Sequence, residues 1–413
     1  MLKITKKSNQ TPLRLILATE ALSSLTNQFM QLLLPWYVLS ATGSVLWTGF
    51  VGFCALLPNI FSAVFGARFI EKIGRSKAML SCEVIQLMLL ASVPVLILWG
   101  KDYPWLVGAI IFASSVFDAP GELARTALSP TFSRYAGVPL SKTTGLVEAF
   151  DGIMSVAGPV LCGLIIACCG LFSAWIWCVS FCVVIVVLCM IVFSHRKPRQ
   201  LRAVPSYGEV WRAVRADRML WLPVLFTVPT FILGQSWELI LLPTYIYEHG
   251  FSSMYLGFLG AAFGLGAFAG VLMFAARADK FTFFKLLTFN YLGYFLSVAV
   301  LYFCLPVWAV LGATALCGLP FGAFGAMMTS VILLRTPVER RSKTLGLYAA
   351  LTYAVESLCI LGLAAWIYKG GLEQMLEGLL FLFAILIMIS IFVRRKEDFW
   401  EVLSSEQKKI FTK

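Results

Sequence analysis

The stretch Leu33-Leu34-Pro35-Trp36-Tyr37 returns about 208 positions later as Leu241-Leu242-Pro243-Thr244-Tyr245. The same register continues without a gap into the residues that follow, and it brings Glu71-Lys72 onto Asp279-Lys280. A second match, at a shift of about 201 positions, aligns SKTTGL at 141–146 with SKTLGL at 342–347. Chance matches do not keep register across intervening loops. The chain therefore consists of two copies of one unit.

The composition places these copies in a membrane. Of 413 residues, 60% are hydrophobic and 13% are charged, whereas soluble domains have roughly half apolar and a quarter charged residues. The net charge of +12 does not indicate nucleic-acid binding, because the basic residues lie between long apolar runs. Nine of the 11 cysteines, Cys304 among them, lie inside those runs. We expect these nine to be small buried residues, and no cysteine spacing predicts a metal site.

Twelve apolar runs are long enough to cross a bilayer, whose hydrocarbon core needs about 20 residues per helix. They predict an all-α polytopic membrane protein with twelve transmembrane helices in two pseudo-symmetric six-helix bundles. The first six runs lie near residues 15–39, 45–68, 78–99, 104–126, 144–167 and 171–193, and the second six near 220–245, 252–275, 284–304, 306–333, 344–368 and 375–393.

The basic residues predict the orientation. Both termini and the connections on their side carry 31 Lys and Arg residues, and the other side carries Lys101 and Lys369. The positive-inside rule therefore places both termini in the cytoplasm. We expect a first bundle at 1–194, a cytoplasmic linker at 195–219, a second bundle at 220–393 and a cytoplasmic tail at 394–413. The basic and apolar residues around Trp211 and Arg215 are typical of a short amphipathic helix that lies on anionic lipid headgroups. A solvated linker would explain these residues equally well.

Two six-helix repeats joined by a cytoplasmic linker resemble the plan of the major facilitator superfamily. The most specific match is ARFIEKIGR at 67–75, which resembles the superfamily's G-x-L-A-D-R-x-G-R signature between helices two and three. The resemblance implies that this segment braces one conformational state, partly through the positive N-terminus of the helix near Ser342. The spacing alone fits a surface ion pair equally. The residues of this switch motif are Glu71, Lys72, Gly74 and Arg75, with Asp279 and Lys280 in the second copy.

Other segments narrow the resemblance to one branch. The stretches FDAP at 117–120, ALSP at 127–130 and TPVER at 336–340 are similar to the branch that contains macrolide-efflux pumps and the enterobactin exporter. Helix five carries Gly158-Pro159-Val160-Leu161-Cys162-Gly163, which is similar to the antiporter element G-P-x-x-G-G, with Cys162 in place of one glycine. Close helix packing with a kink would explain Gly158, Pro159 and Gly163 as well.

Ionisable residues inside the membrane are few. A carboxylate at mid-membrane costs at least about 2.5–3.5 kcal/mol, so each should face a cavity or a partner. On helix one, a single face carries four polar residues, and helix five carries a similar stripe with Asp151. On helix four we expect Arg125 to neutralise Glu122, which leaves Asp118 less well paired as a candidate proton carrier. The stripe on helix one consists of Glu20, Ser24, Asn27 and Gln31.

The second half offers Glu238, beside Gln235 in helix seven, and Glu356 near the middle of helix eleven. The resemblance places helices one, four, seven and ten around a central cavity, with two, five, eight and eleven beside it. Ion pairs at the cytoplasmic helix ends are an alternative for Glu20 and Glu122. Glu83 and Gln86 on helix three suit a structural or lipid-interface role. The expected proton-coupling or cavity residues are Glu20, Asn27, Gln31, Asp118, Glu122, Arg125, Asp151, Glu238 and Glu356.

These features predict a secondary active transporter that works by alternating access. The leading hypothesis is a proton-coupled exporter, an antiporter, of drug-like or siderophore-like small molecules. The alternative is a proton-coupled importer of a small metabolite or iron chelate. An enzyme is not expected, because His195 and His249 are the only histidines and both lie in loops. We expect no cofactor, a monomer, and a multi-pass location in a bacterial inner membrane.

Overall fold

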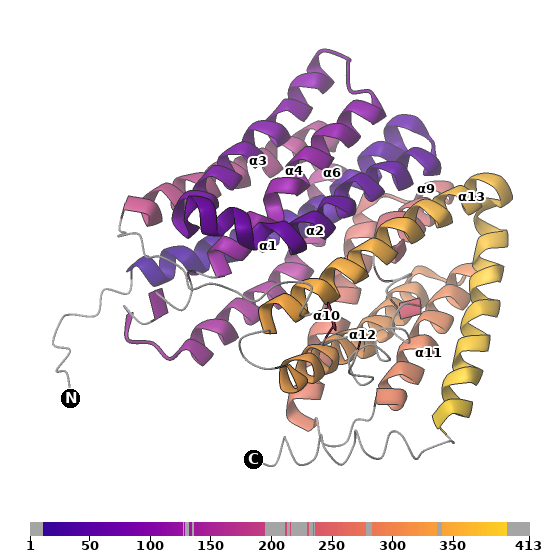
Figure 1. Ribbon diagram of the computed structural model, residues 1–413. Helices are drawn as coiled ribbons and strands as arrows, with labels where there is room; N and C mark the ends of the chain where they lie inside the picture. The colour runs from indigo at the N-terminus through magenta and orange to yellow at the C-terminus, as the bar shows by residue number, and fades with distance from the viewer. Residues whose placement is uncertain are drawn as a thin grey trace.

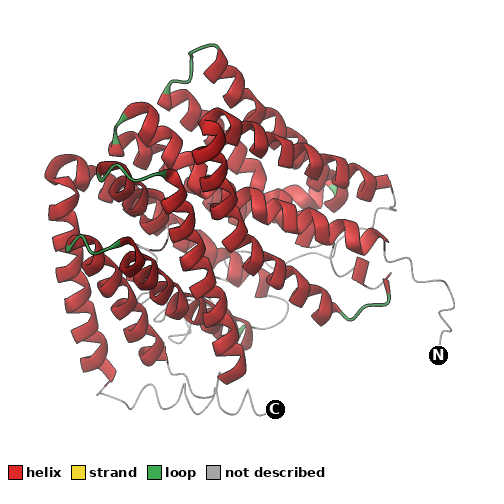
Figure 2. Cartoon of the chain, turned by 180° about the vertical axis from the view of Figure 1, so that it is seen from behind, coloured by secondary structure: helices red, strands yellow, loops and turns green. Residues whose placement is uncertain are grey.

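The computed structural model describes residues 11–126, 128, 132–133, 136–194, 211–212, 215, 229–230, 234, 236–277, 283–336 and 341–394. Within these ranges the chain is helical, and turns connect the helices (Figure 2). Long helices follow from the composition, because every backbone polar group in lipid must be satisfied inside its own segment. Seven of the described helices are long and apolar enough to cross a membrane.

The first half contains five helical segments. They are α1 (Thr11–Thr42), α2 (Val45–Ile73), α3 (Arg75–Leu98), α4 (Pro104–Thr126) and α6 (Leu140–Ser194). The last of these is two transmembrane helices in succession, because Gly170 interrupts it with φ 83° and ψ 169°. Only glycine adopts this conformation without strain. The first half therefore holds the six helices that the sequence predicts.

The second half repeats this arrangement. Its segments are η1 (Trp237–Leu241), α9 (Leu242–Glu248), α10 (Ser253–Arg277), α11 (Phe283–Tyr302), α12 (Val307–Arg335) and α13 (Arg341–Arg394). Helix seven is described by η1, one turn of π-helix, and by α9. Gly371 interrupts α13 with φ 82° and ψ 166°, which is the conformation of Gly170 at a shift of 201 positions. The repeat that the sequence shows is thus also a repeat of backbone geometry.

The two halves form separate groups of helices that meet along one side (Figure 1). Within the first half α1 packs on α6, and α4 packs on α2 and α3. Within the second half α12 packs on α10 and α11. The main contacts between the halves join α2 to α13 and α6 to α10.

Glycines bring the halves together near the turns at Gly43, Gly170, Gly250 and Gly371, and we call this end of the molecule the Gly170 end. A Cβ atom on Gly257 would lie 2.6 Å from the Pro159 carbonyl oxygen, and one on Gly163 would lie 2.9 Å from the Ser253 carbonyl oxygen. The backbones of α6 and α10 are therefore in direct contact there. At the opposite end, which we call the Gly74 end, Glu148 and Asp151 of α6 are exposed. The halves are closed against each other at the Gly170 end.

Two details differ from the sequence-based prediction. The segment 67–75 is not a loop: α2 continues to Ile73, Gly74 makes the turn with φ 91°, and α3 begins at Arg75. Cys304 is not buried in a helix either, because it lies exposed in the turn after α11. All 11 cysteines are free thiols. Elsewhere the described helices match the predicted apolar runs within a few residues. Most of the first part of the run near 220–245 lies outside the described residues, and so do most of the linker at 195–219 and of the tail at 394–413.

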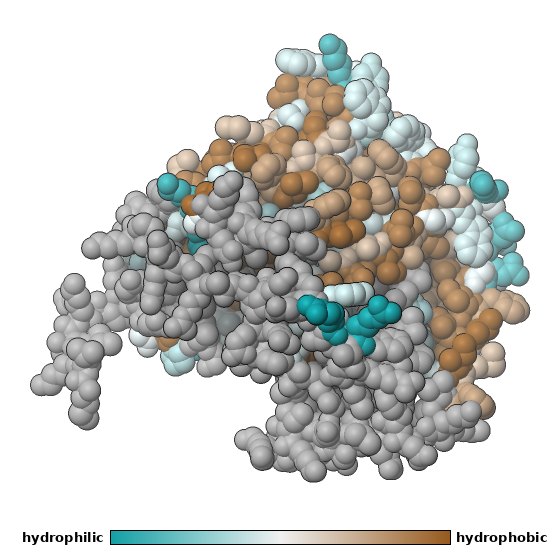
Figure 3. All heavy atoms as spheres, in the orientation of Figure 1, coloured by the Kyte–Doolittle hydropathy of each residue, from teal (hydrophilic) through white to brown (hydrophobic). Residues whose placement is uncertain are grey.

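Hydrophobic side chains cover much of the outer face, and hydrophilic residues lie at its margins (Figure 3). Large apolar side chains on this surface include Met88, Leu316, Leu358, Phe381 and Phe392, each at least 60% exposed. Extended apolar surfaces mark contact with a membrane or another protein, and the length and apolar composition of these helices favour the membrane. The exposed apolar residues therefore mark the membrane-facing side of the helices.

Candidate functional site

A buried ion-pair cluster links three helices of the first half. The Arg125 guanidinium, on α4, contacts Glu83 of α3 through Nη1 and Glu20 of α1 through Nε at 3.3 Å. Its Nη2 donates to the Ser23 hydroxyl at 2.7 Å. Arg125, Glu20 and Glu83 are 1%, 8% and 4% exposed. Gly121 lets α3 and α4 approach, since a Cβ there would lie 3.3 Å from the Cβ of Cys82, the neighbour of Glu83.

This cluster overturns the predicted pairing of Arg125 with Glu122. Both residues lie on α4, but the Arg125 side chain extends between α1 and α3, whereas Glu122 is exposed. Glu20 forms an ion pair, as one alternative proposed, but inside the bundle instead of at the membrane surface. For Glu83 the lipid-interface alternative is wrong, because its carboxylate is enclosed by the bundle.

Asp118 and Glu122 face the space between the halves. Asp118 accepts a hydrogen bond from Gln86 Nε2 at 3.1 Å, so Gln86 has a polar partner and does not face lipid. Both carboxylates interact electrostatically with the Tyr353 ring hydroxyl on α13, across the space between the halves. Glu122 also interacts with Glu20 and Asp151. The surface of α4 that faces the second half is therefore acidic.

The polar stripe on α1 divides between three environments. Glu20 joins the Arg125 cluster, and Ser24 forms a hydrogen bond with Asp151 of α6. Gln31 lies with Gln28 in a small cavity between the halves, and Asn27 is half-buried. Sequence periodicity did not single out Gln28, although its position beside Asn27 on a polar helix was a usable signal.

Glu238 reaches the same cavity from the second half. The cavity has a volume of about 20 Å³, and its lining includes Gln28, Gln31, Pro159, Glu238 and Gly260. Glu238 lies in the π-helical turn η1. Such turns occur mostly as single insertions in α-helices, frequently at functional sites. The turn therefore presents a carboxylate to two amides of the opposite half, in a space with room for about one water.

Glu356 on α13 is 5% exposed and lies near other buried polar groups of the second half. It interacts electrostatically with the Tyr294 hydroxyl of α11, and so does Glu238. The Tyr294 hydroxyl and both amide atoms of Asn290, one turn away, are buried without a hydrogen-bond partner among the described residues. Sequence analysis missed Tyr294 and Asn290, because single polar residues on an apolar helix gave no pattern.

The two sequence motifs have different outcomes. At the switch motif, Gly74 forms the turn, its amide donates to the Ile70 carbonyl at 2.8 Å, and Arg75 is half-buried. The side chains of Glu71 and Lys72, together with Asp279 and Lys280, lie outside the described residues. At the antiporter-like element, Gly158 packs against the α1 backbone, with 3.2 Å from its Cβ position to the Phe29 nitrogen. Pro159 and Gly163 pack on α10 as described above.

Comparison with known proteins decides the family. Residues 16–358 match the Major Facilitator Superfamily. The chain belongs to this superfamily. It is therefore a multi-pass membrane transporter and not an enzyme, and its described helices have the all-α fold of that family.

Similar proteins are known both as curated sequences and as solved structures. The multidrug efflux pump Tap of Mycobacterium tuberculosis is 25% identical over 366 residues, covering 86% of this chain and 87% of that protein. The Tap pump of Mycolicibacterium fortuitum is 23% identical over 397 residues, covering 94% and 97%. Among structures, the nucleoside transporter NupG has a TM-score of 0.74 at 10% identity, covering 92% of this chain and 98% of that one. An inward-facing bacterial homologue of the iron transporter ferroportin has a TM-score of 0.67 at 15% identity, covering 93% and 99%.

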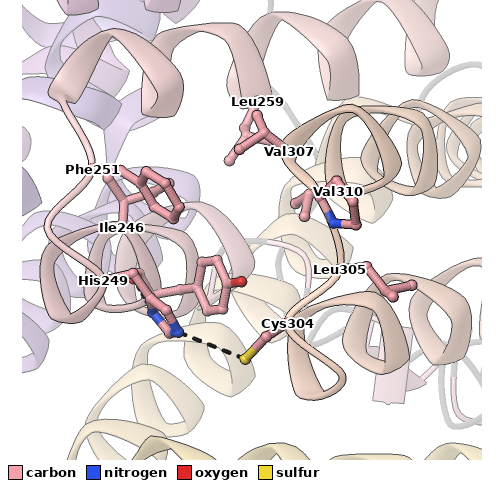
Figure 4. A pocket seen from close by; sticks show the side chains of 10 residues that line it. Ile246, His249, Phe251, Leu259, Cys304, Leu305, Val307 and Val310 are labelled. Carbon is pink, nitrogen blue, oxygen red and sulfur yellow. Dashed lines mark hydrogen bonds between the residues drawn. The ribbon is translucent and has the colours of Figure 1, made fainter.

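A second cavity of this major facilitator transporter is separate from the carboxylates described above. It has a volume of about 190 Å³ and lies at the Gly170 end of the second half (Figure 4). His249 Nε2 and Cys304 Sγ are 3.7 Å apart at its edge, and the other lining side chains are mainly apolar. Within the described residues, no three His, Cys, Asp or Glu side chains are grouped to hold a metal ion.

Proposed function

We propose that this transporter exports neutral or cationic drug-like molecules in exchange for protons. In this proposal both termini are cytoplasmic, so the Gly170 end faces outward and the structure represents a state closed to the outside. Substrate enters between the halves from the cytoplasm. Rocking of the halves then exposes it to the other side while protons return.

One observation carries the proposal: among the described residues, acidic side chains from both halves face the space between them. Asp118, Glu122 and Glu238 point into this space from the two halves. The buried cation Arg125 is engaged by Glu20 and Glu83 and does not reach this space. Acidic walls attract protons and organic cations, and they repel polyanions such as citrate or catecholate chelates.

The groups around these carboxylates suit a mixed apolar and polar ligand. Gln28 and Gln31 supply amide donors and acceptors opposite Glu238. The half-buried Tyr353 ring near Asp118 and Glu122 can stack on an aromatic ligand or face its cationic group. The named relatives are multidrug efflux pumps, and their direction of transport is the reason to prefer export over import.

Proton movement is a sufficient energy source. A proton that enters down 100 mV supplies about 2.3 kcal/mol, and each unit of pH difference adds about 1.4 kcal/mol. Together these sustain a substrate gradient of several hundredfold per proton. The same carboxylate cannot hold the proton and the cationic substrate at once, and this competition couples the two fluxes.

The test uses inside-out vesicles that contain the transporter and have an acidic interior. Ethidium as a lipophilic cation, erythromycin as a macrolide and citrate as a polyanion are added singly, and the interior pH is followed. We expect ethidium and erythromycin to release protons, and citrate to release none. In Glu238→Gln vesicles the release should be lost, whereas Glu373→Gln, at an exposed site far from the cavity, should behave as wild type. Release by citrate, or unaltered release by Glu238→Gln, rejects the proposal.

A further inference from the structure

The Arg125 cluster contains more negative than positive charge. Arg125 keeps its single positive charge at any physiological pH, and two carboxylates contact the guanidinium. With both ionised, the cluster carries a net charge of −1 inside the bundle. Because Arg125 is 1% exposed and Glu83 is 4% exposed, water cannot compensate this charge, and the excess is costly.

The described residues around the cluster add further acidic groups. Arg125 or Glu20 interacts electrostatically with the thiols of Cys82 on α3 and Cys189 on α6, and with the carboxylates of Glu122 and Asp151. These neighbours are acids or neutral thiols, so they oppose a second negative charge. One proton on one of the two carboxyl groups of the cluster makes it neutral.

The geometry distinguishes the two carboxyl groups. Glu83 contacts Arg125 through Nη1, is 4% exposed and is enclosed between α3 and α4 beside Gly121. Glu20 makes one contact of 3.3 Å with Nε. Its neighbour Asp151 is exposed at the Gly74 end and forms a hydrogen bond with Ser24, one turn further along α1. Glu20 therefore lies nearer to a route for protons between the cluster and solvent.

We propose that Glu83 and Arg125 form a fixed neutral pair, and that this pair makes Glu20 a proton-binding residue of the transport cycle. Glu83 is a positioning residue, because its carboxylate neutralises the single positive charge of Arg125. An ionised Glu20 would then be an excess negative charge in the cluster. Glu20 then takes up one proton on a carboxylate oxygen when the cluster is enclosed and releases it when the bundle admits water. The link to transport rests on the proposed function, but the proton binding itself needs no substrate.

The inference predicts an unusual effect of removing Glu83. In Glu83→Gln the isosteric amide leaves Arg125 to Glu20 alone, so the cluster is neutral without a proton. Glu20 should then stay ionised, although it is unaltered in sequence. Ser23 gives the converse variant, since its hydroxyl accepts from Arg125 Nη2 at 2.7 Å. Ser23→Asp in the Glu83→Gln background returns a second carboxylate to Arg125 and should restore proton binding by Glu20.

Infrared difference spectra of the purified full-length transporter in lipid nanodiscs, recorded between high and low pH, test this directly. The carbonyl stretch of a protonated carboxyl group identifies the titrating residue. We expect a wild-type component that is lost in Glu20→Gln and also in Glu83→Gln, and that returns in Glu83→Gln with Ser23→Asp. Glu20→Asp should shift its frequency, and Glu83→Asp should not. Glu373→Gln is the matched control and should give the wild-type spectrum.

Three results would overturn the proposal. They are a Glu20 component that persists in Glu83→Gln, a frequency shift caused by Glu83→Asp, and an unchanged spectrum in Glu20→Gln. If Glu83→Gln does not fold, Ser23→Asp alone tests the same charge balance, because a third carboxylate on Arg125 should add a second protonated component. If the wild-type transporter shows no substrate-driven proton release while Glu20 still titrates, the proposed function is rejected and this inference stands.

Discussion

Cys304 adopts a backbone conformation that glycine adopts in the other repeat. Its φ is 48°, and Gly100, in the equivalent turn of the first half, has a φ of 62°. In both turns this residue's amide donates to the carbonyl three residues earlier, and the next amide donates to the carbonyl five residues earlier. A side chain in the left-handed region costs roughly 1–2 kcal/mol. Cys304 thus retains strain that its counterpart avoids.

Replacing Cys304 with glycine should therefore stabilise the transporter. The relief of strain exceeds the entropy cost of glycine, about 0.5–1 kcal/mol, so the free energy of unfolding should rise by about 0.5–1 kcal/mol. Denaturant unfolding in detergent micelles measures this change. The reciprocal variant Gly100→Ala should destabilise by about 1–2 kcal/mol, because no atom lies within 4 Å of its Cβ position and only the backbone is strained. A lower stability for Cys304→Gly would show that the contact with His249 outweighs the strain.

The partners of Arg125 mark the limit of sequence-based prediction at this scale. Spacing identifies Glu122 as reachable, because residues three apart share a helix face. It cannot show that α1 and α3 present Glu20 and Glu83 to the same guanidinium. Those contacts depend on how three helices pack. For one of the partners, Glu83, the sequence suggested a structural or lipid-interface role. The acidic residues of the site could be found from the sequence, and their pairing could not.

At the scale of the element, the contact between α6 and α10 holds the Gly170 end closed. Gly257→Leu places a branched side chain where a single Cβ already lies 2.6 Å from the Pro159 carbonyl oxygen. Overpacking of this kind costs about 1–3 kcal/mol. Because the contact joins the halves, the cost falls on the closed state, and the population should shift about 5- to 150-fold toward states open at the Gly170 end.

Spin labels at Lys101 and Lys369, exposed residues of opposite halves at the Gly170 end, report this shift as a longer distance. The pair is introduced after the exposed cysteines Cys168, Cys169 and Cys304 are replaced with serine. Gly362→Leu on α13 is the control, since no atom lies within 4 Å of that Cβ position. The same distance distribution in Gly257→Leu and Gly362→Leu would remove the closing role of the glycine contact.

The breaks at Gly170 and Gly371 allow a test of the repeat. Each residue has a positive φ with ψ near 170°, and no atom lies within 4 Å of either Cβ position. Alanine at either site meets backbone strain alone, of about 1–3 kcal/mol. We expect Gly170→Ala and Gly371→Ala to lower the free energy of unfolding by that amount and by the same amount as each other. Unequal losses in detergent unfolding would show that the two breaks are not structurally equivalent.

Element boundaries were predictable to the extent that lipid imposes them. A span must be about 20 apolar residues long, so the apolar runs located the described helices within a few residues. The π-helical turn at Glu238 and the one-residue connection at Gly74 were not predictable. Both depend on local backbone geometry, which a hydropathy pattern does not record.

At the scale of the whole molecule, the repeat is preserved in the backbone and lost in the charges. The first half pairs its buried acids with Arg125 and Gln86. In the second half, Glu238 and Glu356 lie near Tyr294, whose buried hydroxyl has no hydrogen-bond partner among the described residues. In the proposed function the common fold supplies the rocking motion. The first half therefore differs from the second in that it holds a buried cation with two carboxylate partners.

Orientation in the membrane is a property of the whole chain, and the exposed cysteines can test it. Cys168, Cys169 and Cys304 are the exposed thiols, and all three lie at the Gly170 end. The excess of Lys and Arg at the opposite end predicts that the Gly170 end faces outward. A membrane-impermeant maleimide should therefore label the wild-type chain in spheroplasts and not in inverted vesicles.

In the variant with serine at all three positions this labelling should disappear. Lys77 is an exposed site at the Gly74 end, so Lys77→Cys added to that variant should be labelled in inverted vesicles alone. The reverse pattern would place the termini outside, and the acidic space between the halves would then be open to the exterior in this structure, as an importer requires.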